Sequence, residues 1–156
     1  MDFLIQNGIV VNAEGSARTD VLVQNGRIAA MGEGLACANA VRINAEGCFL
    51  LPGFIDTHTH FDLDTGSART ADDFVTGGRA AVLGGTTTVL DFATQDRGGT
   101  LVQAFDTWQE KARGCSCNYG FHMAIAEWND KTAAEQMCIR DRYITNAVLR
   151  QAIVAL

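Results

Sequence analysis

In the stretch LPGFIDTHTHFD, Leu51–Asp62, the pattern of the sequence changes, and two of the three histidines lie near its end. Pro52 is the only proline among the 156 residues. Short apolar runs separated by turns precede it, whereas strand and helix patterns alternate after it. Residues 54–58 are predicted as a short buried strand that leads into His58 and His60.

The composition limits the classes of protein to consider. The length suits one ordinary domain, and 47% of the residues are hydrophobic, which is enough for a real core. The formal charge of −6 and the lack of a Lys/Arg cluster argue against nucleic acid or an anionic membrane as partner. The sequence shows neither an apolar run of membrane-spanning length nor a secretory signal. The five cysteines, with Cys115 and Cys117 as the close pair, are interpreted as reduced cytoplasmic thiols.

Residues 1–51 are predicted to form a small antiparallel β-unit. The stretches IQNGI (5–9) and VQNGRI (23–28) are near-copies, and each places Asn-Gly between apolar residues. This pattern is typical of a hairpin with a type I′ turn, in which both central residues have positive φ. About 50 residues make a thin core, so we expect this unit to depend on another segment.

The chain beyond Gly53 alternates strands and helices. Thr70 is predicted to cap a helix that has Asp72 and Asp73 in its first turn and ends at Gly84-Gly85. A buried strand is expected at residues 86–92. This order of elements favours a parallel sheet with right-handed crossovers.

A second helix is predicted from Thr100, where Gln103 completes a capping box. Its one-sided apolar stripe consists of Leu101, Phe105, Trp108 and Ala112. Trp108 is therefore assigned to the core. A third strand is expected at residues 118–126, and His122 within it is expected to be a buried core histidine.

The His-Thr-His spacing indicates a possible metal site. Residues i and i+2 of a strand point to the same side, so His58 and His60 would present two imidazoles to one point. Neutral imidazole is a good zinc ligand, and Asp56 and Asp62 are placed to orient the rings through their second nitrogens. The alternative is an ordinary polar turn at the end of a strand. Asp91, at the end of the next strand, is assigned either to this site or to a structural hydrogen bond, the latter being preferred.

The motif in LLPGFIDTHTHFD resembles the amidohydrolase superfamily signature Pro-Gly-x-Ile-Asp-x-His-x-His. Four further stretches, TADDF, GGTTTVLDFA, TWQEKA and YGFHMAI, are similar to its cyclic-amidase branch, dihydropyrimidinase and D-hydantoinase. The resemblance covers nearly all of residues 1–137. It implies an α/β fold, namely the start of a TIM-type (β/α)8 metal-dependent hydrolase barrel, about three of eight strands, preceded by part of a small β-sandwich.

The resemblance also implies a domain order and an activity. Residues 1–51 would form the partial β-sandwich domain and residues 52–137 the N-terminal part of the barrel. The family members are cytoplasmic zinc enzymes, commonly homotetramers, with two ions per subunit. They open a dihydropyrimidine or hydantoin ring to an N-carbamoyl amino acid. By the motif match His58 and His60 would bind zinc, and the loop containing Asp62, Leu63 and Asp64 would help to line the substrate site.

The family's site needs more residues than this chain supplies. It uses four histidines, a carboxylated lysine that bridges the metals and an acid/base aspartate. Lys111 is expected on a helix and Lys131 in a loop, so neither matches the bridging lysine, which is absent from this chain. The chain is therefore expected to be an N-terminal fragment that is inactive alone. Alternatives are an allantoinase or dihydroorotase and, in another class, a non-catalytic dihydropyrimidinase-related scaffold protein.

Residues 138–156 show no motif that we can assign to the family, so this tail is expected to be of uncertain origin. They fit either a diverged third helix, with an apolar side of Ile144, Val148 and Leu149, or a segment from outside the original reading frame.

Overall fold

The computed structural model describes residues 1–135, which fall into two compact units. The first unit comprises Met1–Gly53, and the second begins at Phe54. The interpretations of residues 138–156 fall outside the described part of the chain. Within residues 1–135, no helix has the length and apolar character needed to cross a membrane.

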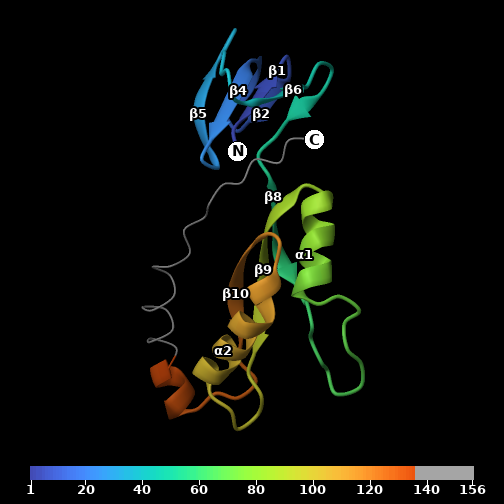
Figure 1. Ribbon diagram of the computed structural model, residues 1–156. Helices are drawn as coiled ribbons and strands as arrows, with labels where there is room; N and C mark the ends of the chain where they lie inside the picture. The colour runs from blue at the N-terminus through green and yellow to red at the C-terminus, as the bar shows by residue number, and fades with distance from the viewer. Residues whose placement is uncertain (136–156) are drawn as a thin grey trace. The chain divides into compact units, whose positions relative to one another are not determined.

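The first unit contains two small β-sheets (Figure 1). One has the order β5-β4-β1-β6, formed by Arg27–Gly32, Asp20–Gln24, Phe3–Gln6 and Val41–Asn44. The other has the order β3-β2-β7, formed by Gly15–Arg18, Ile9–Asn12 and Phe49–Leu50. Ile5 and Val21 from the first sheet and Leu50 from the second share one buried cluster. The expectation of a purely antiparallel unit is wrong, because β1 pairs with β6, and β2 with β7, in parallel.

The two Asn-Gly sequences have different roles. Asn25-Gly26 joins the antiparallel strands β4 and β5 with φ angles of 52° and 71°, which confirms that predicted hairpin. Asn7-Gly8 is not a hairpin, because β1 and β2 belong to different sheets. At Gly8 a Cβ atom would lie 3.1 Å from the Cβ of Ala45. This glycine is therefore used for a close approach of two segments rather than for a tight turn.

The second unit is a parallel three-stranded sheet in the order β10-β9-β8. Its strands are β8 (Phe54–Thr59), β9 (Thr86–Thr94) and β10 (Asn118–Ala124). Helix α1 (Phe74–Leu83) connects β8 to β9, and helix α2 (Leu101–Lys111) with a short 3₁₀ turn (Ala112–Gly114) connects β9 to β10 (Figure 1). The predicted alternation of strands and helices is confirmed.

The helix ends follow local capping, with one correction. The Thr100–Gln103 capping box of α2 is present as predicted. Helix α1, however, is capped by Asp73, which accepts hydrogen bonds from the backbone N–H groups of Val75 and Thr76. Thr70 instead accepts a hydrogen bond from the N–H of Leu63, 2.9 Å away. Asp73 is the better cap because its carboxylate reaches two of the unpaired N–H groups at once.

The helices cover one face of this sheet. The buried cluster on that face consists of Phe74, Ala93, Trp108 and Ala112, and the predicted apolar stripe of α2 is buried throughout. Along β9, Val89, Asp91 and Ala93 are buried toward the helices, whereas Leu90 and Phe92 alternate with them and are partly exposed. We call the face that carries Phe92 the open face.

Candidate metal centre

The strand that leads to the two histidines lies at an edge of the sheet. In the described part of the chain β8 pairs only with β9. All its residues except Thr59 are exposed, including Phe54 and Ile55, which are 58% and 54% exposed. The expectation of a buried strand is therefore wrong for this chain. An edge strand with no neighbour on its other side leaves its apolar side chains in contact with water.

His58 and His60 lie together on the open face. Their ring centroids are 5.1 Å apart, in an edge-to-face arrangement. Both rings contact Phe92, with centroid distances of 4.6 Å for His58 and 5.0 Å for His60. The two imidazoles thus share one side of the chain, as expected from the two-residue period of a strand. Their function as metal ligands stays a prediction.

Asp91 anchors the chain on both sides of His60. Its side chain is only 1% exposed, and its Oδ2 accepts hydrogen bonds from the Thr59 hydroxyl at 2.9 Å and the Phe61 N–H at 2.8 Å. Its Oδ1 accepts one from the indole N–H of Trp108 at 3.0 Å. Asp91 therefore makes structural hydrogen bonds of the kind expected, and its contribution to a metal site stays a prediction. The polar function of Trp108 was missed, because nothing in an apolar helical stripe indicates which tryptophan N–H finds a buried acceptor.

The two aspartates that flank the motif contact backbone and cations. Asp56 Oδ1 accepts a hydrogen bond from the backbone N–H of His58 at 3.0 Å. The Asp62 carboxylate forms ion pairs with Arg69 at 3.4 Å and with Lys111 at 3.5 Å. These contacts replace the predicted ones to the imidazole nitrogens. Both aspartates therefore shape the chain around the histidines rather than orienting the rings directly.

The predicted substrate loop is folded back on itself. It forms the long connection between β8 and α1 (Figure 1). Asp64 Oδ1 accepts a hydrogen bond from the Gly66 N–H at 2.8 Å, and Asp64 pairs with Arg69 as an isolated bridge. Leu63 packs against the buried cluster under the helices. Of the three loop residues predicted to face substrate, Leu63 thus faces the core instead, because its apolar side chain is stabilised by burial.

His122 is not a buried core histidine, so that expectation is wrong. Its side chain is exposed on the open face, 4.9 Å from Phe92 between ring centroids. Its Nε2 lies 3.1 Å from the carbonyl oxygen of Thr57. The sequence does contain a signal for this position, namely the apolar residues Phe121 and Met123 on either side of His122. Because both pack toward the helices, strand alternation places His122 on the opposite face.

The donors on the open face fit part of a metal site. Two neighbouring imidazoles are suitable ligands for zinc and related ions. Residues 1–135 contain no group of three or more His, Cys, Asp and Glu side chains that could hold a metal ion. Lys111 lies on α2, with its ammonium 4.3 Å from the centroid of the Trp108 ring, on the covered side of the sheet. The described residues thus supply two candidate ligands, and a complete site would need further donors.

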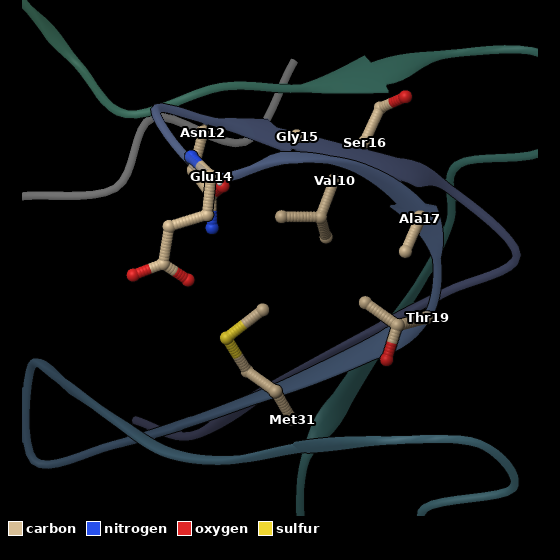
Figure 2. Close-up of a pocket in the computed structure, with 8 residues that line it drawn as sticks. All are labelled: Val10, Asn12, Glu14, Gly15, Ser16, Ala17, Thr19 and Met31. Carbon is tan, nitrogen blue, oxygen red and sulfur yellow. Dashed lines mark hydrogen bonds between the residues drawn. The ribbon is translucent and has the colours of Figure 1, made fainter.

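The first unit contains a hollow that is lined by residues other than those predicted for the site. It lies among β2, β3 and β5, and Val10 and Met31 point into it from two sides (Figure 2). Its lining consists of Val10, Asn12, Glu14, Gly15, Ser16, Ala17, Thr19 and Met31. Glu14 is the one titratable side chain among these residues. None of the residues predicted to bind metal or substrate lines this hollow.

The fold and the histidine pair together define a class of protein. The start of a β/α barrel carries His-x-His at the carboxyl end of its first strand, where barrel enzymes place their sites. A family model described as the amidohydrolase family matches residues 49–148. The chain belongs to the amidohydrolase family, which confirms the predicted membership.

Within this family, the chain is similar to D-hydantoinases and dihydropyrimidinases. The chain is 43% identical over 136 residues to a D-hydantoinase of Geobacillus stearothermophilus, covering 86% of this chain and 29% of that protein. It is 41% identical over 139 residues to a dihydropyrimidinase of Rattus norvegicus, covering 85% and 27%. The crystal structure of a dihydropyrimidinase from Brevibacillus agri matches with a TM-score of 0.87 and 39% identity, covering 91% of this chain and 31% of that one. This structural match confirms the predicted fold class.

The chain is much shorter than the relatives that it matches. The chain spans about 30% of the relatives it matches. Membership of the family implies a metal cofactor. Among the described residues, His58 and His60 are the two candidate ligands for it.

Proposed function

We propose that the full-length protein containing this chain hydrolyses the C–N bond of a cyclic amide, opening a dihydropyrimidine or hydantoin ring to an N-carbamoyl amino acid. The observation that carries the proposal is the pairing of His58 and His60 on the open face of a family-matched sheet. The names of the relatives, D-hydantoinase and dihydropyrimidinase, support this substrate class.

The proposed metal is zinc, with two ions per subunit in the full-length protein. His58 and His60 would hold one of them through imidazole nitrogens. A bound zinc ion lowers the pKa of water and polarises a carbonyl group. The chain's own contribution is orientation, because Asp91 fixes Thr59 and Phe61 and so limits how far His60 can move. The other ligands and the acid/base residue are expected outside this chain, which alone is expected to be inactive. A cytoplasmic homotetramer is the proposed form.

The first experiment uses the full-length protein. Metal content is measured by elemental analysis, and ring opening is measured with dihydrouracil, hydantoin, allantoin and dihydroorotate. We expect about two zinc ions per subunit and turnover of the first two compounds. His58→Ala and His60→Ala are each expected to lower metal content and abolish most of the turnover. Arg113→Ala, which removes an exposed ion pair with Glu110, is the control and is expected to keep both.

The outcomes separate the alternatives. Turnover of allantoin or dihydroorotate in place of dihydrouracil and hydantoin would move the proposal to another cyclic amidase. A wild-type protein without metal and without turnover would favour the scaffold class and overturn the proposal. Turnover that is unchanged in His58→Ala would show that this pair is not part of the site.

A further inference from the structure

The His122 side chain reaches across the sheet. It starts on β10, and its Nε2 lies 3.1 Å from the carbonyl oxygen of Thr57 on β8. Strand β9 lies between these two strands. His122 is directly opposite Phe92 in the β10–β9 register, and its ring contacts Phe92 on the way. Phe92 is also the residue against which His58 and His60 pack. All three histidines therefore contact one phenylalanine on the open face.

The acceptor of this contact lies in an irregular part of β8. Asp56 pairs with Val89, but Thr59 pairs with Asp91. Three steps along β8 therefore match two steps along β9, so β8 carries one extra residue between Asp56 and Thr59. Such a bulge bends a strand and redirects its side chains, and it is common beside active sites. Here the bulge contains Thr57 and His58, so its conformation decides where the His58 imidazole points.

Two side chains stabilise the bulge from different directions. The Asp56 carboxylate accepts a hydrogen bond from the His58 N–H at 3.0 Å. His122 contacts the Thr57 carbonyl, which belongs to the same peptide group as that N–H. A carbonyl oxygen only accepts hydrogen bonds, so the Nε2 of His122 must carry the proton in this contact. The Thr57–His58 peptide is thus held at both its oxygen and its nitrogen, directly before the first histidine of the pair.

We propose that His122 is a positioning residue for the His58–His60 pair. Its Nε2–H holds the Thr57 carbonyl and thereby keeps the bulge in the conformation that brings the two imidazoles to one side. His122 acts on the site through the backbone of β8 and does not touch the reacting atoms. This inference rests on the proposed metal-binding function of His58 and His60.

The test compares two replacements at position 122 in the full-length protein. His122→Phe keeps a ring against Phe92 but removes the donor. His122→Gln has a side-chain amide that can donate from near the position of Nε2. We expect His122→Phe to release zinc to a chelator at least about tenfold faster than wild type, whereas His122→Gln stays within about threefold. Tyr119→Phe, on the opposite face of β10, is the control and is expected to release zinc at the wild-type rate.

A second measurement reports geometry rather than affinity. With cobalt in place of zinc, the visible absorption spectrum depends on how the ligands are arranged. The spectrum is expected to change in His122→Phe and to resemble wild type in His122→Gln. If His122→Phe does not fold, as judged by circular dichroism, His122→Met replaces it as the variant without a donor.

Each result bears on the proposal. Faster release and a changed spectrum in the variant without a donor, restored by glutamine, support it. Equal behaviour of both variants, whether both keep the metal or both lose it, overturns it, because the donor would then make no difference. A wild-type protein that binds metal while both variants behave like wild type overturns this inference alone. A wild-type protein that binds no metal overturns the proposed function as well.

Discussion

The indole N–H of Trp108 on α2 donates a hydrogen bond of 3.0 Å to Oδ1 of Asp91 on β9. The other carboxylate oxygen of Asp91 receives hydrogen bonds from Thr59 and Phe61, which flank His60. A helix residue in the apolar core is thereby connected through one buried carboxylate to the chain segment that carries a proposed metal ligand. The position of that segment depends on packing as well as on its own sequence.

Asp91→Asn is expected to destabilise the second unit. An amide offers one accepting oxygen, so its NH₂ group would face donors that now bind a carboxylate oxygen. Leaving buried donors without an acceptor is expected to lower the free energy of unfolding by about 2–3 kcal/mol. Urea denaturation of the full-length protein, followed by tryptophan fluorescence, measures the change. Asp106→Asn, an exposed position on α2, is the control; an equal effect of the two variants would contradict the prediction.

Trp108→Phe tests the other end of the same contact. Phenylalanine keeps an apolar ring in the cluster but lacks the N–H group that Asp91 accepts. We expect a loss of about 1–3 kcal/mol, measured by urea denaturation. Trp128→Phe is the matched control, because Trp128 is 61% exposed, and it is expected to have little effect. In the double variant with Asp91→Asn, the loss of stability should be smaller than the sum of the losses in the two single variants. A loss equal to that sum would show that the residues are not coupled.

Gly26→Ala is expected to destabilise the β4–β5 hairpin. Gly26 has a φ of 71°, and an alanine there would enter the left-handed region at a cost of roughly 1–2 kcal/mol. Gly84→Ala is the comparison, because Gly84 has a φ of −86° and its nearest neighbours would lie 3.5 Å from an added Cβ. Thermal unfolding of the two variants measures the difference. A smaller effect at Gly26 than at Gly84 would show that the turn is not constrained as described.

Cys117 is expected to make stability fall at alkaline pH. Burial, with a further contribution from the Cys115 thiol 3.5 Å away, raises the pKa of Cys117 from an ordinary 9.0 to about 12. The folded protein thus keeps this proton while the unfolded chain releases it above pH 9.0. The stability that the raised pKa provides is complete below pH 9.0 and is lost as the pH rises toward 12.

The measurement is the urea midpoint between pH 8 and pH 11, compared with Cys117→Ala, in which this part of the decline should disappear. Alkylation offers an independent check. Cys48 is exposed and should react with iodoacetamide at pH 8, whereas Cys117 should react only after unfolding. Equal alkylation rates in the folded protein would contradict the raised pKa.

Several features of the fold could be predicted because their causes are local. The Thr100–Gln103 capping box depends on residues three positions apart, and the Asn25-Gly26 turn depends on two adjacent ones. The cap of α1 was misplaced by three residues, since Thr70 and Asp73 are both good caps and only Asp73 reaches two free N–H groups. Asn7-Gly8 was misassigned because identical turn sequences do not show whether the next strand stays in the same sheet.

The strand–helix alternation and the family could be read from the sequence, because they follow from side-chain periodicity, capping and a compact motif. The packed structure was needed to show the bulge in β8 and the partners that the polar residues find. Asp91 accepts hydrogen bonds from two segments, the chain around His60 and helix α2, and His122 reaches β8 across an intervening strand. Such contacts join residues as far as 65 positions apart, so their geometry arises only when the strands and helices pack together.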